Sequence, residues 1–426
     1  MRVMIITILL AYLLGNGYIF WKLWNFMGSP SSKWAITCFP TAIKISVAII
    51  FWSIAFALFI SIGARNLQMP SVIFKILHLT GSCWLVFMLY TLMLLAVTDL
   101  ARLIIPALRT AGWFSSSNIF PWCCGIVTVI LIGGYINYIN PQIVPLNITL
   151  NQKELAAEQT EKQTAEQACK PLKIVAVSDI HLGYGTGKHL ISKYVKKINA
   201  QKPDIVLIVG DLIDNSIKPV KEKGLHKELD KIEAPFGIYM VPGNHEYISG
   251  ISDCKRLLSK TRIKLLQDST VTIPFPNTSL PDSLSGTYGG LIRIIGRDDR
   301  SNRNRKTLEA LLQVTHTTCT ASSTDQNHDA SKANIEKEIV YTILIDHQPY
   351  DLAMADSPGI DLQIYGHTHH GQIWPISLLT EKIYEQSHGV RKWNNSHIYV
   401  SSGLSLWGPP FRIGTQSEIG VVEISL

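Results

Sequence analysis

Five short groups of potential metal ligands recur in the second half of the chain. Each group contains Asp, Asn or His and follows a run of apolar residues of strand length. The groups are Asp179-Ile180-His181, Gly210-Asp211, Gly243-Asn244-His245-Glu246, Asp346-His347 and Gly366-His367-Thr368-His369. Such donors suit two divalent ions of intermediate hardness, and one carboxylate can bridge both ions. A single D-x-H or G-D is usually a turn or a cap, but five groups in order at strand ends indicate a metal site.

The segments before these groups have the pattern of an α/β domain. Residues 173–177 and 205–209 are apolar runs typical of buried strands, and residues 188–200 between them have helical spacing, which predicts a βαβ unit. Because functional groups in such folds lie where strands end, the ligands are expected to converge. Further strands are expected at 237–241, 291–295, 340–345, 362–365, 397–400 and 420–424, with surface insertions at 274–286 and 315–334.

The order of the five groups resembles the calcineurin-like metallophosphoesterase family over residues 172–426. The family pattern is D-x-H, G-D, G-N-H-[DE], H and G-H-x-H, and all of it is present. The stretches YGHTHHGQIWP and SSGLSLWGPPFRIGTQSEI resemble its membrane-tethered branch, the transmembrane proteins with a metallophosphoesterase domain. The resemblance implies an α/β fold with a two-sheet β-sandwich flanked by helices, in the layer order α/β/β/α.

The resemblance also implies a role for each ligand. Two ions, whether Mn, Fe or Zn, would activate a bridging hydroxide that attacks phosphorus. His245 would face the phosphate, where it would stabilise the transition state or protonate the leaving oxygen. Glu246 or Asp214 would orient neighbouring His rings. The implied ligands are Asp179, His181 and His369 for the first ion, Asn244, His347 and His367 for the second, and Asp211 as the bridge.

Two further residues are candidate substrate contacts. Arg300 belongs to the basic run GRDDRSNRNRK, which either grips a second phosphate or forms a solvated surface. His370 follows G-H-T-H where the branch commonly has Gly, and it is either a substrate contact or an exposed side chain. Asn215 replaces the Arg of the phosphoprotein phosphatase pattern G-D-x-x-D-R-G, which argues against phosphoserine or phosphothreonine as substrate.

The N-terminal part has the composition of a membrane module. The chain of 426 residues is 47% hydrophobic and 17% charged, and its first 140 residues hold four uncharged apolar stretches. Each stretch has about the 20 residues that a membrane-crossing helix needs, and none has an ionisable group well inside, which favours an anchor over a transporter. Trp21, Trp122 and Tyr138, among other aromatic residues, fall near stretch ends, as in an interfacial belt. The predicted spans are 3–21, 45–64, 76–98 and 119–139, followed by a polar stalk at 141–171.

The charge distribution bears on partners and on topology. The net charge of +7 falls within residues 1–146, so the C-terminal part is net neutral and nucleic acid is not an expected partner. Basic residues in the first and third connections favour those loops in the cytoplasm, which places the catalytic domain outside the cytoplasmic membrane. The expected partners are the lipid bilayer and a phosphorylated small molecule or lipid.

These patterns predict a membrane-anchored, dinuclear-metal phosphoesterase. Its substrate is expected to be a phosphodiester, phosphomonoester or pyrophosphate of a lipid-linked or envelope compound. Two alternatives stay open: a pyrophosphatase of the UDP-diacylglucosamine type in lipid precursor metabolism, and a non-catalytic membrane scaffold on the same fold.

Overall fold

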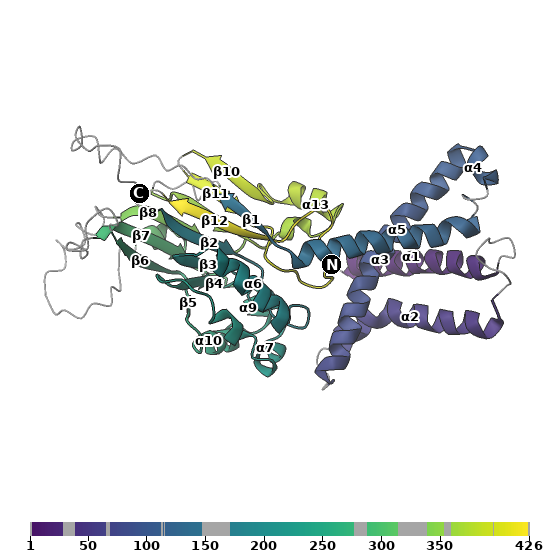
Figure 1. Ribbon diagram of the computed structural model, residues 1–426, viewed down its shortest axis with the longest axis horizontal. Helices are drawn as coiled ribbons and strands as arrows, with labels where there is room; N and C mark the ends of the chain where they lie inside the picture. Colours follow the sequence, from purple (N-terminus) through teal and green to yellow (C-terminus); the bar gives the residue numbers. More distant parts are fainter. Residues whose placement is uncertain are drawn as a thin grey trace. The chain divides into compact units, whose positions relative to one another are not determined.

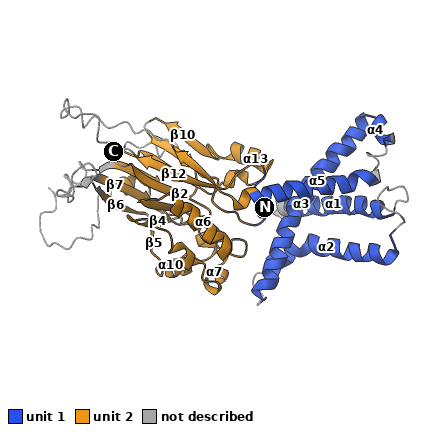
Figure 2. Ribbon diagram, viewed as in Figure 1, with its two compact units in different colours: residues 1–136, 408–413 blue, residues 137–407, 414–426 orange. Residues whose placement is uncertain are grey.

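The computed structural model divides the chain into two compact units. Unit 1 contains residues 1–136 and 408–413, and unit 2 contains residues 137–407 and 414–426 (Figure 2). The structure describes residues 2–28, 39–64, 69–111, 114, 116–146, 171–276, 288–313, 339–352, 359–394 and 396–424.

Unit 1 is built from long apolar helices. Four of them are long and apolar enough to cross a membrane, so the four predicted spans are confirmed as helices of that kind. They extend beyond the predicted limits, and a 34-residue helix measures about 51 Å, more than the roughly 30 Å of hydrocarbon in a bilayer. The helices, labelled in Figure 1, are α1 (Arg2–Gly28), α2 (Thr41–Gly63), α3 (Ser71–Ile104) and α5 (Ser116–Ile139), with the short α4 (Ala107–Thr110) before the last.

A partly buried ion pair joins α1 to α3. Because α1 continues past Trp21, Lys22 lies inside the helix, and its side chain is only 3% exposed. The Nζ atom of Lys22 donates to Oδ1 of Asp99 at 2.9 Å, and Tyr18 donates to the same carboxylate. A charge buried among apolar helices requires such a partner. The sequence did not predict this pair, because the first span was expected to end before Lys22.

Unit 2 is a sandwich of two six-stranded sheets. The first sheet has the order β1-β12-β2-β3-β4-β5 and the second has the order β10-β11-β9-β8-β7-β6 (Figure 1). The strands of the first sheet are β1 (Gln142–Leu146), β12 (Glu418–Ile424), β2 (Leu172–Val177), β3 (Ile205–Val209), β4 (Ile238–Val241) and β5 (Ile263–Leu265). Those of the second are β10 (Gly389–Trp393), β11 (Ser396–Val400), β9 (Leu362–Tyr365), β8 (Ile339–Ile345), β7 (Tyr288–Gly296) and β6 (Ser269–Pro276).

Apolar side chains fill the space between the sheets and cover their outer faces. Alternate residues of β3, such as Leu207, pack against residues of the second sheet, such as Ile343, in one buried cluster. The intervening residues of β3, such as Val206, pack on the opposite face against the helices. Helix α11 (Leu308–Gln313) covers the outer face of the second sheet. The predicted α/β/β/α sandwich is therefore confirmed. The helices on the first sheet are α6 (Lys188–Ala200), α7 (Lys218–Glu222), α8 (His226–Leu229) and α10 (Ile251–Leu258).

The structure differs from the sequence prediction around the stalk. Residues 142–146 form β1, which pairs in parallel with β12, so the first sheet begins where the stalk was expected. Residues 147–170 lie outside the described residues, as do 277–286 and 315–334 of the two expected insertions. Tyr138 is buried, and its hydroxyl lies 3.1 Å from Oγ of Ser405, so it is a core residue of unit 2 and does not belong to an interfacial belt.

Candidate metal centre

The predicted ligands converge because they follow the ends of neighbouring strands. Asp179 comes two residues after β2, Asp211 two residues after β3, and Asn244 three residues after β4. His347 and His367 each come two residues after a strand of the second sheet. Parallel strands end at the same edge of a sheet, so both sheets deliver these side chains to a common edge of the sandwich.

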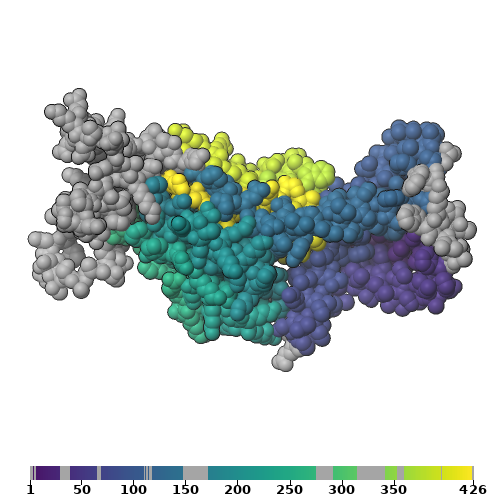
Figure 3. All heavy atoms as spheres, viewed as in Figure 1, coloured from purple at the N-terminus to yellow at the C-terminus, as the bar shows by residue number. Residues whose placement is uncertain are grey.

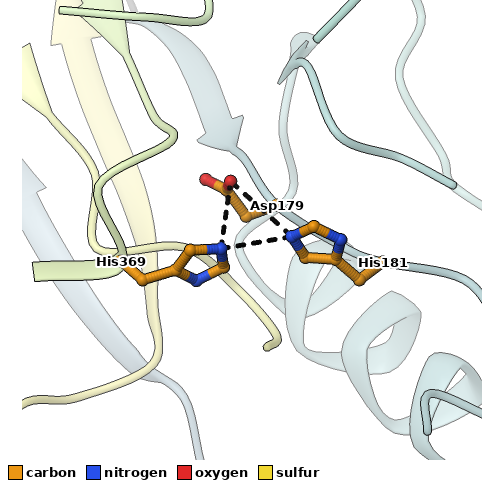
Figure 4. A group of neighbouring side chains, drawn as sticks. All are labelled: Asp179, His181 and His369. Atoms are coloured by element: carbon orange, nitrogen blue, oxygen red, sulfur yellow. Dashed lines mark hydrogen bonds and ion pairs between the residues drawn. The ribbon is translucent and has the colours of Figure 1, made fainter. Parts of the chain in front are cut away.

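The first group of ligands contains Asp179, His181 and His369 (Figure 4). The two Nε2 atoms of the His rings lie 3.1 Å apart. Oδ1 of Asp179 lies 3.4 Å from Nε2 of His369 and 3.8 Å from Nε2 of His181. Two imidazole nitrogens and one carboxylate oxygen facing one point are a donor set that suits a divalent ion.

The second group is formed by Asp211, His347 and His367, and a further group, which overlaps both, is formed by His181, Asp211 and His245. Oδ2 of Asp211 lies 3.1 Å from Nε2 of His347 and 3.9 Å from Nε2 of His181, which belongs to the first group. A single carboxylate therefore faces both groups. Burial would raise the pKa of Asp211, but the neighbouring His rings, foremost His347, lower it far below its ordinary value. The carboxylate is thus ionised and in position to bridge two cations.

The chemical state of the site fits metal binding. Burial lowers the pKa of His181 and of His367, which favours the neutral ring, the form that binds a metal. Burial would also lower the pKa of His347, but the Asp211 carboxylate raises it, so a cation at this site would replace the His347 proton. Nδ1 of His347 lies 2.9 Å from the carbonyl oxygen of Val209, and its donation there turns Nε2 toward Asp211. Oδ1 of Asn244 is buried without a hydrogen-bond partner among the described residues. A buried acceptor of that kind is expected where a cation completes the site.

The backbone around the ligands is strained. Five of the seven implied ligands have positive φ although they are not glycine, a conformation that costs of order 1–3 kcal/mol each. Such strain persists only where the surrounding structure imposes it, and it is concentrated here at a candidate site. The residues and their φ values are Asp179 (54°), His181 (47°), Asp211 (51°), His367 (72°) and His369 (49°).

Glycine is required where the ligand loops approach each other. A Cβ atom on Gly243 would lie 2.2 Å from Oδ1 of Asp211, and one on Gly366 would lie 2.7 Å from Oδ2 of Asp179. Neither distance is sterically possible, so any side chain there would displace a ligand.

His245 and Asp214 lie beside the two ligand groups. The His245 ring packs edge-on against His181, with 4.6 Å between ring centroids, and its backbone N–H donates to Oδ1 of Asp211 at 2.9 Å. Nδ1 of His245 lies 3.5 Å from Oδ1 of Asp214, and Nδ1 of His181 lies 3.8 Å from the same oxygen. Asp214 therefore faces both rings, as expected of a residue that orients them. Burial raises the pKa of Asp214 to about 6.

Glu246 acts on the loops and not on the His rings. Its carboxylate accepts hydrogen bonds from the backbone N–H groups of Asp211, Ile213 and Gly243 at 2.8–3.0 Å. Burial and the nearby Asp211 charge raise the pKa of Glu246 to about 8. The side chain fixes the loop after β3 to the loop after β4, so it positions the bridging carboxylate indirectly.

The two candidate substrate contacts are both engaged with protein groups. Arg300 pairs with Asp351, and its guanidinium lies 5.0 Å from the centre of the Tyr350 ring. His370 is partly buried: Nε2 lies 3.3 Å from Oε1 of Glu381, and the ring stacks on His388 at 4.6 Å. The fully exposed interpretation of His370 is therefore incorrect. A substrate role for either residue stays a prediction.

The basic run around Arg300 neutralises a buried acid. Arg297 and Arg305 lie 3.2 and 3.3 Å from Oδ2 of Asp346, which is 1% exposed. Both arginines therefore form ion pairs with Asp346, the residue that directly precedes His347. The sequence contained a signal for this role, since an acid that follows a buried strand requires partners.

An aromatic pair beside the second group was not predicted. The Tyr384 ring lies 6.2 Å from the His367 ring, and its hydroxyl is within 3.3 Å of the Tyr350 hydroxyl. Tyr384 follows α13 (Ile376–Ile383), a helix that the sequence analysis did not identify because its apolar pattern is short.

Comparisons with known proteins show similarity to metallophosphoesterases. Residues 172–371 match the sequence model of the family "Calcineurin-like phosphoesterase". An uncharacterized metallophosphoesterase of Helicobacter pylori is 32% identical over 257 residues, which are 60% of this chain and 60% of that protein. A transmembrane protein with metallophosphoesterase domain from Bos taurus is 30% identical over 252 residues, which are 58% of this chain and 52% of the relative. The chain therefore spans about half to three fifths of the length of these relatives.

A solved structure shows a more distant similarity. The NAD nucleotidase of Haemophilus influenzae (NadN) shares 19% identity, with a TM-score of 0.32, over 56% of this chain and 46% of that protein.

Proposed function

Because residues 172–371 carry a calcineurin-like phosphoesterase domain, we propose that the protein is a membrane-anchored hydrolase of phosphate esters that uses two divalent metal ions. The observation that supports this most strongly is the position of Asp211, whose Oδ2 atom faces His347 of one ligand group and His181 of the other. Asp179, His181 and His369 would hold one ion and Asn244, His347 and His367 the other, with Asp211 shared. The ion pair would polarise the phosphate and activate a water molecule.

The protein's own groups would act on the leaving oxygen and the ligand loops. His245 lies beside the His181 ring, where it can hold a proton for the leaving group, and Asp214 keeps the His245 ring oriented through Nδ1. Glu246 fixes the backbone of Asp211 and Gly243 by direct hydrogen bonds. Arg300 and His370 are proposed to contact the parts of the substrate beyond the reacting phosphate.

The substrate class is proposed from the membrane anchor. A hydrolase on four membrane-type helices is held at a bilayer, so a lipid-linked or envelope phosphodiester, phosphomonoester or pyrophosphate is the proposed substrate. The catalytic unit is proposed to face away from the cytoplasm, on the basis of the basic short loops. The opposite orientation would favour a pyrophosphatase of the UDP-diacylglucosamine type.

Hydrolysis of a generic ester tests the proposed activity. The full chain, purified in detergent and stripped with a chelator, should hydrolyse bis-p-nitrophenyl phosphate only after Mn²⁺ is restored. A screen of lipid phosphates, nucleotide-sugar lipids and phosphodiesters then ranks the substrates. A chain that binds metal but hydrolyses none of these compounds would support the non-catalytic scaffold instead.

A further inference from the structure

Helix α13 exposes apolar side chains on the surface of unit 2. Its only buried residue is Ser377, while Ile376, Leu378, Leu379 and Ile383 are 42–57% exposed. Trp374, two residues before the helix, is 45% exposed. The helix forms part of the visible surface in Figure 3, in yellow-green. We call these five apolar residues, Trp374, Ile376, Leu378, Leu379 and Ile383, the α13 face.

This arrangement differs from that of an ordinary surface helix, because α13 exposes its apolar residues together with its charged ones. A helix on a soluble domain buries its apolar residues and exposes its polar ones. Among the described residues of unit 2, nine large apolar side chains are exposed, and five of them fall within residues 374–383. Contiguous apolar surface of this kind marks a binding surface for a protein or a membrane.

Hydrogen bonds within unit 2 connect the α13 face to the end of a membrane helix. The span Asn118–Ile139 of α5 is one of the four membrane-type helices, and its last residues belong to unit 2. Nδ2 of Asn137 donates to the carbonyl oxygen of Thr415 at 2.6 Å, and Oγ1 of Thr415 donates to the carbonyl oxygen of Gln372 at 2.6 Å. Gln372 is two residues from Trp374. The α13 face thus begins close to the C-terminal end of a helix that is long and apolar enough to cross a membrane.

The same helix is in contact with the candidate metal centre. The backbones of Gly371 and Ser377 are in close contact. A Cβ atom added to Gly371 would lie only 2.5 Å from the backbone N of Ser377. Glu381 lies 3.3 Å from His370, and Tyr384 packs against His367. Whatever covers the α13 face therefore lies next to the G-H-x-H loop.

We propose that the α13 face inserts into the interfacial region of the bilayer that holds the four helices, and that the metal centre takes its phosphate from an amphiphile at that depth. A bilayer is the occupant that the observations favour, because four helices of the same chain are long and apolar enough to cross one. Trp374 beside aliphatic residues, with Glu381 and Lys382 on the same short helix, is a composition typical of an interfacial helix. The inference of an amphiphilic substrate rests on the proposed function, whereas the inference that the α13 face inserts into the bilayer does not.

Photocrosslinking tests the insertion independently of activity. The photoreactive amino acid p-benzoylphenylalanine is placed at Leu379 in the full chain, which is reconstituted in nanodiscs of radiolabelled phosphatidylcholine. The control carries the same group at Lys260, an exposed residue just after α10. Labelled lipid at position 379 and not at 260 is expected. Equal labelling at both positions, or a crosslink from 379 to a second protein chain, would overturn the proposal.

Substitution tests the consequence for catalysis. The double variant Leu379→Glu/Ile383→Glu should hydrolyse a phosphate ester embedded in phosphatidylcholine nanodiscs roughly tenfold more slowly, because two apolar side chains no longer enter the bilayer. Its rate with water-soluble bis-p-nitrophenyl phosphate should equal that of the wild type, which also reports that the variant is folded. Equal rates on both substrates would contradict the role of the face in catalysis. A wild type inactive on the soluble ester would instead refute the proposed function.

Discussion

At the scale of single residues, His245 is the group whose removal separates chemistry from metal binding. Its ring lies beside His181 but is not among the implied ligands. His245→Ala should keep its metal and lose turnover by about 10²–10⁴, as for loss of a general acid. The loss should be smaller for esters with better leaving groups, because these need less protonation.

Rates across a series of substituted phenyl esters, together with metal content, check this prediction. Equal losses across the series would assign His245 to charge stabilisation, and unchanged rates would remove it from the mechanism.

The candidate ligands and the position of Asp214 beside the His rings were accessible from the sequence, whereas the role of Glu246 was not. Asp179, Asp211 and His347 follow apolar strand-length runs, so their convergence follows from strand geometry alone. The role of Glu246 could not be predicted in the same way. It depends on the distance between two backbone loops, and that distance is set only when β3 and β4 pair.

At the scale of elements, the loops after β3 and β4 must touch for the site to form. Gly243→Ala would place a methyl group 2.2 Å from Oδ1 of Asp211, so the bridging carboxylate must move. Metal affinity should fall by about 10–100-fold, as when a supporting contact of a ligand is lost. Gly185→Ala is the control, because its added Cβ meets nothing within 4 Å.

Metal titration of both variants, monitored by recovery of activity, measures the effect. Equal affinities for Gly243→Ala and the wild type would mean that the two loops do not support the site together.

Strand β12 carries a buried acid that should make stability depend on pH. Burial would raise the pKa of Glu418, but hydrogen bonds with His388, Ser402 and Tyr399 lower it below the ordinary 4.5. Because the pKa of Glu418 is lower in the folded chain than in the unfolded chain, the ionised carboxylate stabilises the fold at pH values above the pKa of the unfolded state. This stabilisation is lost as the pH falls through the pKa of the folded state. Glu418→Gln should therefore cost about 1–3 kcal/mol at pH 7 and progressively less below pH 4.5.

Unfolding of the full chain in nanodiscs at several pH values checks this behaviour. Glu423→Gln on the same strand is the control, because Glu423 pairs with Lys173 at the surface and should change little. A cost for Glu418→Gln that does not vary between pH 7 and pH 3 would contradict the assigned cause.

Elements of mixed composition were the hardest to predict. Strand β1 was assigned to the stalk, and its Pro145 is tolerated because β1 is the edge strand of its sheet. Helix α13 has an apolar pattern that does not reveal which side is buried, and its exposure became visible only in the structure.

At the scale of the whole molecule, the side of the membrane on which the catalytic unit lies decides which substrates can reach the site. The basic short loops predict that the C-terminus lies outside the cytoplasm. Fusions at Leu426 to a reporter active only outside the cytoplasm should therefore work, and fusions to a cytoplasmic reporter should not. The reverse result would move the UDP-diacylglucosamine-type pyrophosphatase to first place among the candidate activities.

Electron paramagnetic resonance of the Mn²⁺-loaded chain reports directly whether one carboxylate joins two metal ions. Because Asp211 faces both ligand groups, the wild type should give the many-line spectrum of two exchange-coupled ions. Asp211→Asn removes the bridging charge, so it should give weakened binding and only the six-line signal of isolated ions. A wild type that shows only isolated ions at saturating Mn²⁺, with the same spectrum and turnover in Asp211→Asn, would contradict the account.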